Sequence, residues 1–453
     1  MAAKWKMAVT GALAGALIIS ATACGSSDNS SNGGNNTAGN ASGGGANNGG
    51  QQQETVTFWS WVPTDIQSKK VIEEFEKQNP NIKVDYWRGE QSDFQKKLQV
   101  AIAAGEGPDL MGMQVGGMLN QYANTLEPIK PMADDKWGAG WEDQFVSSAI
   151  DQVKATDGTM VALPLNLTGQ EFVLYNKAIF DKLGIKDVPK TYDEWTKVNA
   201  TIKAAGIVPV AMGAKDTWHD VDMFVALSNQ FAPGKIYEAE QGKAKFTDQA
   251  FVDTMKAWKK MFDEVFQDGA LGLSTYPDAR DQYFYSGKAA MFLTGSWHVG
   301  YALPGGEKAG SKIENDATGM FLLPQIGPNP SRAAASVDTA LAISKESKHK
   351  DAAWKLLEFM TKGDGQQIMA DFIQGSPAKK GIEVKTLDQF KFDSEKEAVK
   401  TVNEAIANAV GKRLLNYPEL NNALGVALQN VAAGQKIEDA LAEVQKASEG
   451  ITR

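Results

Sequence analysis

A chain of 453 residues, 43% of them hydrophobic, can bury a large core but is too long for a single core of typical size, so we expect two lobes or domains. The formal net charge of -9 indicates no basic face, and nucleic acid is therefore not an expected partner. With a single cysteine, the chain can form neither an internal disulfide nor a cysteine-based metal site.

The N-terminus has the pattern of an export signal. Lys4 and Lys6 are followed by an apolar run at 7–20, by small residues at 21–23 and then by Cys24. A basic start, a short apolar run and small residues before a cleavage point are typical of a signal peptide, here 1–23. The apolar run is too short to span a membrane comfortably.

Small residues directly before Cys24 resemble the lipobox of bacterial lipoproteins, although Ala21 stands where leucine is usual. The resemblance implies that Cys24 is diacylated and becomes the mature N-terminus. The protein would then be lipid-anchored on the outer face of the cell membrane. Ordinary signal cleavage with an incidental cysteine is the alternative.

The segment after the cysteine is expected to be a tether, which gives a linker at 24–54. Residues 25–53 are nearly all Gly, Asn, Ser and Gln, and such a composition cannot form a core. A flexible chain of this length spans roughly 30 Å. It would keep a folded body close to a partner in the membrane.

The folded region is expected to begin near Thr55 with alternating strands and helices. Strands are predicted at 56–61, 82–87 and 109–113, with helices between them. Ser92 and Gln95 have the spacing of a capping box, which predicts a helix that starts at this point. Strands that alternate with helices indicate a parallel sheet with crossover helices.

The same pattern continues to the end of the chain. Thr191 and Glu194 form a second expected capping box, and a strand is predicted at 207–212. Further helices are expected from Asp248, at 347–360 and at 437–447. The fold class is therefore α/β throughout.

Several segments together resemble the family-1 extracellular solute-binding proteins of ABC importers, the carbohydrate-binding group that includes maltose-binding protein. Each segment is short, but their order and spacing cover nearly all of 55–453. They are VTFWSW at 56–61, FEKQNP at 75–80, GEGPDL at 105–110, LYNKAIFDKLG at 174–184, TYDEW at 191–195, GKAAMF at 287–292, GSW at 295–297, AISK at 342–345 and KDAAWKLLEFM at 350–360.

The resemblance implies two α/β lobes joined by crossing strands, with the ligand in the cleft and closure by hinge bending. It implies a substrate-binding protein that captures a sugar or oligosaccharide for an ABC permease, without enzymatic activity or cofactor, and as a monomer. Crossings are expected near 165–169, 317–320 and 361. The lobes would be 55–168 with 320–361, and 169–319 with 362–453.

Tryptophans are the first candidates for ligand contact. Trp59 and Trp61 share a face at the end of the first strand, where ligands of α/β sheets bind, and Trp61 is the favoured ligand residue of the two. The alternative is that one of the pair belongs to the core. A flat aromatic ring flanked by polar groups suits a sugar ring. By resemblance, Trp218 and Trp297 are stacking residues and Asp216 is a hydrogen-bonding acid. A surface loop with an anchoring tryptophan is the alternative at Trp218, and a similar structural role at Trp297.

Polar candidates follow several predicted strands. Gly116 and Gly117 stand where maltose-binding protein has an Asp-Arg pair, so maltose itself is not the expected ligand. The polar candidates, with one late aromatic, are Gln91, Gln114, Asn166, Asp338 and Tyr417.

Three other classes of protein stay open. A non-sugar solute such as a polyamine, peptide or metal chelate is the nearest alternative, since the acidic residues near Trp218 would suit a cation. A secreted glycoside hydrolase would need a defined carboxylate pair, and no pair stands out. A structural adhesin would not require a two-lobed α/β body.

Overall fold

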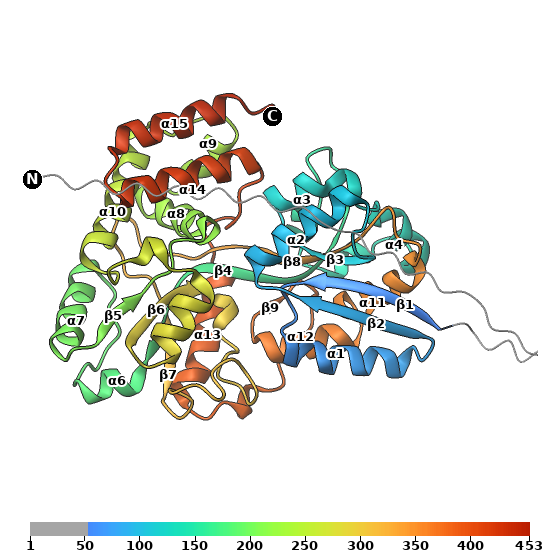
Figure 1. Ribbon diagram of the computed structural model, residues 1–453, viewed down its shortest axis with the longest axis horizontal. Helices are drawn as coiled ribbons and strands as arrows, with labels where there is room; N and C mark the ends of the chain where they lie inside the picture. Colours follow the sequence, from blue (N-terminus) through green and yellow to red (C-terminus); the bar gives the residue numbers. More distant parts are fainter. Residues whose placement is uncertain (1–52) are drawn as a thin grey trace, which may run out of the picture. The chain divides into compact units, whose positions relative to one another are not determined.

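The computed structural model describes residues 53–453, and the expected signal peptide, Cys24 and nearly all of the expected linker lie outside them. The strands of the described part form one sheet in the order β2-β1-β3-β8-β4-β6-β5, with β7 and β9 also paired to β4 (Figure 1). Their bounds are β1 Glu54–Ser60, β2 Ile82–Arg88, β3 Leu110–Met113, β4 Leu163–Asn176, β5 Val208–Ala211, β6 Ala289–Gly295, β7 Thr318–Leu322, β8 Ala334–Ile343 and β9 Ser376–Pro377.

Helices cover the sheet. Those near β1, β2 and β3 are α1 Asp65–Gln78, α2 Gln91–Ala104, α3 Gly117–Tyr122, α4 Ile129–Trp137, α5 Ser147–Gln152, α11 Lys350–Thr361 and α12 Asp364–Ile373. Those near β5, β6 and β7 are α6 Lys177–Lys182, α7 Tyr192–Ala204, α8 Thr217–Phe231, α9 Lys235–Glu240, α10 Gln249–Glu264, α13 Asp393–Ala407, α14 Pro418–Ala432 and α15 Ile437–Glu449. We call these two groups, with their strands, the β1 half and the β6 half.

The β1 half has the expected parallel arrangement. Strand β1 pairs in parallel with both β2 and β3, because α1 and α2 return the chain each time to the same end of the sheet. Val56 and Phe58 on β1 are buried in one hydrophobic core with Val71 and Phe75 of α1 and Phe94 of α2. This packing places the carboxyl ends of the strands at one edge, where Trp61 follows β1.

Strand β4 joins the two halves (Figure 1). Its first part, up to Gln170, pairs with β8, and its last part pairs with β6 on one side and β7 on the other. The pairing shifts register near Asn166, where β4 also pairs with β9, and again after Gln170, where β7 replaces β8 as the partner.

The two expected capping boxes have different outcomes. In α7 the Thr191 side chain accepts from the Glu194 amide, and Glu194 accepts in return from the Thr191 amide, so this prediction is confirmed. The prediction at Ser92 is wrong, because α2 already begins at Gln91 with Glu90 as its N-cap. The Ser92 hydroxyl instead donates to Asp216 Oδ1 at 3.4 Å, across the two halves.

Candidate functional site

A cavity of about 720 Å³ lies where the β1 half faces the β6 half. The β1 half contributes the ends of β1 and α12 and the starts of α1 and α2. The β6 half contributes the π-helical segment Thr275–Tyr285, the 3₁₀ turn Ser296–His298 and the loop 300–312. Sites for small ligands typically measure about 300–1,000 Å³, so this cavity can enclose one.

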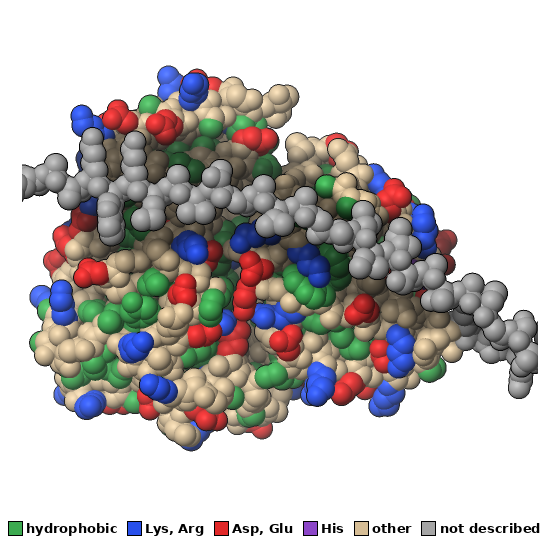
Figure 2. Space-filling model, in the orientation of Figure 1, with side chains coloured by type: hydrophobic (Ala, Val, Ile, Leu, Met, Phe, Trp, Pro, Cys, Tyr) green, Lys and Arg blue, Asp and Glu red, His purple; other side chains and the backbone are tan. Residues whose placement is uncertain are grey.

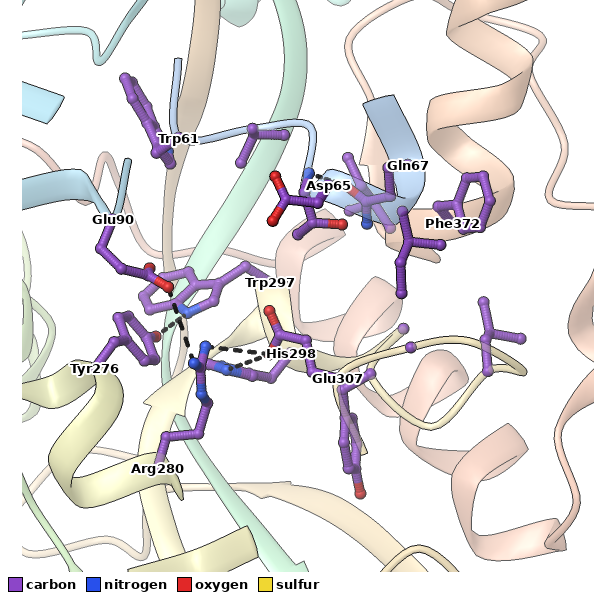
Figure 3. Close-up of a pocket in the computed structure, with 18 of the residues that line it drawn as sticks. Trp61, Asp65, Gln67, Glu90, Tyr276, Arg280, Trp297, His298, Glu307 and Phe372 are labelled. Atoms are coloured by element: carbon purple, nitrogen blue, oxygen red, sulfur yellow. Dashed lines mark hydrogen bonds and ion pairs between the residues drawn. The ribbon is translucent and has the colours of Figure 1, made fainter. Parts of the chain in front are cut away.

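Three side chains of the β6 half form what we call the aromatic cluster: Trp218, Tyr276 and Trp297. The Trp218 ring lies 6.2 Å from the Tyr276 ring at an angle of 23°, and 6.1 Å from the Trp297 ring. Trp297 Nε1 donates to the Tyr276 hydroxyl at 2.6 Å (Figure 3). All three rings are half-buried and line the cavity, so they offer it an aromatic wall in which Trp297 is tilted by 57° against Trp218.

The position of Trp297 depends on the residue two before it. Strand β6 ends at Gly295, and a Cβ added there would lie 2.0 Å from the Trp297 ring. A side chain at this position would therefore displace the indole. The glycine of the Gly295-Ser296-Trp297 motif is explained by this close approach.

Trp61 faces the aromatic cluster from the β1 half (Figure 3). Its side chain is 8% exposed and packs against the Phe94 ring, with 5.2 Å between the ring centres. Its Nε1 donates to Asp338 Oδ2 at 3.4 Å. Trp61 is therefore partly core and partly cavity wall, and Asp338 fixes its orientation.

A buried arginine connects these groups. Arg413 is 1% exposed, donates from Nη2 to Asp338 Oδ1 at 2.6 Å, and has Nη1 3.0 Å from Asp222 Oδ2. Its guanidinium centre also lies 4.8 Å from the centre of the Trp297 ring, which is a cation–π geometry. One cation thus contacts Trp297 and the same carboxylate that accepts from Trp61.

A second charged network crosses the cavity (Figure 3). Arg280 Nη1 lies 3.4 Å from Glu307 Oε2, and its Nη2 lies 3.9 Å from Glu90 of the β1 half. His298 Nε2 lies 3.4 Å from the same Glu307 oxygen. Burial by itself would raise the pKa of Glu307, but the hydrogen bond with His298 and the charge of Arg280 outweigh it and hold the pKa at about 2. Glu307 is therefore ionised at any pH near neutrality.

Most of the residues predicted from the sequence line this cavity. They are Trp61, Gln91, Gln114, Asn166, Trp218, Trp297 and Asp338. Gln91 donates to Gln114 Oε1 at 3.3 Å, while Gln91 Oε1 and Asn166 Oδ1 have no hydrogen-bond partner among the described residues. Such buried acceptors are normally satisfied by water or by a ligand.

Three predicted residues do not line the cavity. Trp59 lies in a separate shallow hollow beside α2, with Lys97 Nζ 4.0 Å from the centre of its ring. Tyr417 is the N-cap of α14, and the Arg453 guanidinium lies 5.6 Å from its ring.

The third, Asp216, is the N-cap of α8. Its Oδ2 accepts from the Thr275 amide at 2.7 Å. Asp216 thereby supports the residue next to Tyr276, although its own side chain lies outside the cavity wall.

Sequence reasoning missed Tyr276, Arg280, Glu90 and Arg413, all of which line the cavity. Tyr276 has an extended backbone (φ -130°, ψ 130°), and Arg280 lies in the π-helical turns after it; the whole segment has no regular apolar period and so gives no helix signal. Arg413 lies in an irregular stretch before α14, and only the three-dimensional fold places it beside Asp338.

Gly116 and Gly117, which replace the Asp-Arg pair of maltose-binding protein, lie where the two halves approach closely. The Gly117 amide donates to the Leu415 carbonyl at 2.9 Å. Gly116 has φ +80°, and a Cβ there would lie 2.5 Å from the Leu415 oxygen. Glycine is therefore required at position 116 by backbone contact with the segment before α14, whereas a Cβ on Gly117 would meet the Asn421 side-chain nitrogen at 2.8 Å.

Within residues 53–453 there is no group of three or more His, Cys, Asp or Glu side chains placed to hold a metal ion. None of the helices in this part of the chain is long and apolar enough to cross a membrane.

A buried acid on α8, two residues after Trp218, leads to a testable prediction. Asp220 is completely buried, and neither of its oxygens has a hydrogen-bond partner among the described residues. Burial, with repulsion from Asp216, raises the pKa of Asp220 well above its usual value. The stabilisation from protonated Asp220 is fully present below about pH 4 and is lost as pH rises toward the folded-state pKa.

We therefore expect Asp220→Asn to gain stability relative to the wild type as pH rises. The difference in unfolding free energy between the two proteins should change by up to about 1.4 kcal/mol per pH unit between pH 5 and the folded-state pKa of Asp220. Urea unfolding across this pH range measures it. A difference that stays constant with pH would show that Asp220 is not protonated in the folded protein.

Comparison with known proteins identifies the class. The sequence profile of the bacterial extracellular solute-binding protein family matches residues 63–367. The chain therefore belongs to this family, whose members act outside the cytoplasm. The profile covers the part of the chain that supplies most of the cavity wall.

Two individual relatives are each less than 30% identical to this chain. A multiple sugar-binding protein of Streptococcus mutans is 27% identical over 326 residues, which are 70% of this chain and 73% of the relative. A probable sugar-binding periplasmic protein of Mesorhizobium japonicum is 29% identical over 294 residues, 58% of this chain and 63% of the relative.

Solved structures share the fold at low identity. A chitin oligosaccharide binding protein has a TM-score of 0.71 at 24% identity, over 87% of this chain and 98% of the other. The maltose-bound MalE3 of T. maritima has a TM-score of 0.71 at 22% identity, over 87% of this chain and 99% of the other. The expected two-lobed α/β fold of this class is thereby confirmed.

Proposed function

We propose that this protein captures a neutral sugar or oligosaccharide in the cavity between its two halves and delivers it to the permease of an ABC importer. One observation carries the proposal: the aromatic cluster and Trp61 enclose a cavity from both halves. A sugar ring has apolar C–H faces and a polar rim, so it fits between flat rings with amides and carboxylates at their edges. The names of the curated relatives support the same ligand class.

The charges that line the cavity favour a neutral ligand over a polyamine. Each arginine of the wall is already ion-paired: Arg88 with Glu90, Arg280 with Glu307, and Arg413 with Asp338. Figure 2 shows acidic and basic side chains close to one another near the middle of this face. A ligand charge placed against any of these arginines or their carboxylates would have to displace an existing partner, at a cost in free energy. The other charged side chains of the wall, Asp65 and Lys312, are exposed.

Binding would act on the equilibrium between open and closed forms. The ligand contacts both halves, so it favours the arrangement in which both walls reach it. We place the lobe division along β4, and propose that the first lobe extends to the end of α12. Gln78 of α1 donates to Asp364 of α12 at 3.0 Å, which supports this extension.

A screen of thermal unfolding tests the proposed ligand class. We expect at least one neutral mono- or oligosaccharide to raise Tm, and spermidine and a dipeptide to leave it unchanged. A ligand at 100 times its Kd adds about 2.7 kcal/mol to the free energy of unfolding. Stabilisation by spermidine or the dipeptide alone would contradict the proposal. Release of reducing sugar from an oligosaccharide in the same mixture would favour a hydrolase.

We also propose that Cys24 carries the lipid that anchors the protein, since small residues precede it and a polar tether follows. Cys24→Ala is expected to move the protein from the membrane fraction of expressing cells to the soluble extracytoplasmic fraction. Immunoblots of both fractions measure this. Equal membrane retention of the variant and the wild type would count against lipidation at this residue.

A further inference from the structure

The loop 300–312 forms much of the cavity wall on the β6 half, yet it contains no helix or strand. Its glycines are Gly300, Gly305, Gly306 and Gly310. A segment of this composition has high conformational freedom unless other contacts fix it. The side chains that the loop presents to the cavity are therefore placed by its attachments to the rest of the protein.

Glu307 is the acidic side chain of this loop, and it lies on the cavity wall beside Arg280 and His298 (Figure 3). Its Oε2 lies 3.4 Å from both His298 Nε2 and Arg280 Nη1, and 3.5 Å from the Tyr285 hydroxyl. All of these contacts use Oε2, so Oε1 can accept a further hydrogen bond. Because Glu307 is ionised, a hydroxyl group of a sugar is a suitable donor to it.

The contacts of Glu307 do not by themselves hold the loop in place, since they are longer than the usual range of about 2.7–3.2 Å. The next residue, Lys308, makes stronger contacts and is not part of the cavity wall. It is 4% exposed, and its Nζ donates to Glu395 Oε1 at 2.7 Å, to Thr318 Oγ1 at 3.3 Å and to the Asp316 carbonyl. An ammonium group has three N–H donors, so each of them has a partner.

The partner of Lys308 is itself firmly held. Glu395 lies in the first turn of α13, is 2% exposed, and accepts from the Thr318 hydroxyl and the Phe392 amide as well. Two apolar residues of similar volume often give the same stability as a buried ion pair, because the attraction only offsets the cost of removing both charges from water. What this pair adds is a fixed geometry, since directed hydrogen bonds hold Nζ at one point.

We propose that Lys308 is a positioning residue for ligand capture: anchored to Glu395, it holds the loop so that Glu307 Oε1 accepts a hydroxyl group of the bound sugar. The inference rests on the proposed function for the class of ligand. It adds Glu307 to the residues that contact the sugar, and it gives the Lys308–Glu395 pair a role in binding.

Calorimetry with the sugar found by the thermal screen, at a temperature at which every variant is fully folded, tests this inference. Glu307→Gln keeps the shape but removes the charge, and it should weaken binding by about tenfold or more. Lys308→Met with Glu395→Gln removes both buried charges together and keeps the acceptor for the Phe392 amide, so the variant should fold with a Tm near that of the wild type. It should also weaken binding by about tenfold, because Glu307 is no longer held in place.

A triple variant separates positioning from a general structural effect. If Lys308 acts through Glu307, adding Lys308→Met and Glu395→Gln to Glu307→Gln should weaken binding by less than about threefold more. Hydrogen exchange of the ligand-free protein gives a second measurement. In the Lys308→Met, Glu395→Gln variant the amides of the loop should exchange faster, while those of β1 and β8 exchange as in the wild type.

Lys350→Met with Glu127→Gln is the matched control, since this Lys–Glu pair is 2.8 Å apart but lies outside the cavity wall. It should change neither the Kd nor the exchange of the loop. An unchanged Kd in the Lys308→Met, Glu395→Gln variant would overturn the inference and leave sugar capture intact. Losses that multiply in the triple variant, or faster exchange throughout the sheet, would overturn it by assigning the pair to stability alone. Failure of the wild type to bind any sugar would overturn the proposed function and this inference together.

Discussion

Replacing Arg413 by alanine is expected to destabilise the folded protein by about 3–5 kcal/mol, because removal of one partner from a buried ion pair leaves uncompensated charge. Arg413 is 1% exposed and contacts both Asp222 and Asp338. The change would leave two buried carboxylates without their cation. Urea unfolding at neutral pH, followed by tryptophan fluorescence, gives the difference in free energy.

Two further variants make this prediction specific. Arg413→Lys keeps the charge but cannot reach both carboxylates with a planar group, so it should recover only part of the loss. Arg332 is exposed and donates from Nη2 to the Asn408 carbonyl, and Arg332→Ala should cost no more than about 1 kcal/mol. An equal loss of unfolding free energy in Arg413→Ala and Arg332→Ala would show that the buried ion pairs of Arg413 do not stabilise the protein more than a surface contact does.

The largest expected effect on ligand binding follows from removing two rings of the aromatic cluster. Trp218→Ala with Trp297→Ala should weaken sugar binding by about 3 kcal/mol, more than 100-fold in Kd, because each lost indole removes apolar contact area and a stacking surface. Isothermal calorimetry measures the Kd with whichever sugar the thermal screen identifies. Unchanged affinity in the double variant would place the ligand elsewhere.

Trp59 supplies the matched control for that experiment. It is a half-buried tryptophan on β1, two residues before Trp61, but it lies outside the cavity and packs against Trp87 and Lys97. Trp59→Ala is therefore expected to leave the Kd unchanged, whereas Trp61→Ala should raise it. A raised Kd for Trp59→Ala with an unchanged Kd for Trp61→Ala would show that Trp59, and not Trp61, contacts the ligand.

Much of the fold could be predicted because local patterns and tertiary packing agree. The alternation of strand and helix in 54–113 follows apolar periods that the sheet then buries, as at Val56 and Phe75. The start of α2 could not be placed to the residue, because Ser92 has the chemistry of a cap but uses its hydroxyl for a contact with Asp216. Contacts between distant segments are invisible to a local pattern.

The site was predictable only where a residue type and its neighbours point to ligand contact. Trp218 and Trp297 stand in polar surroundings or after small residues, and both line the cavity. Arg413 and Arg280 lack such a signal, since an isolated arginine most often lies on the surface. Their burial depends on carboxylates that are remote in sequence, such as Asp338 for Arg413.

The place of β8 in the sheet has a consequence for how the chain folds. Strand β8 lies between β3 and β4, and Leu110 pairs with Ile343. The β1 half therefore cannot complete its sheet until most of the chain has been synthesised. Until then β3 presents an open edge, and closure of so long a loop carries an entropic cost that slows folding. Each half is built from segments that lie far apart in the sequence. A gene fragment that encodes only the first part of the chain would therefore complete neither half.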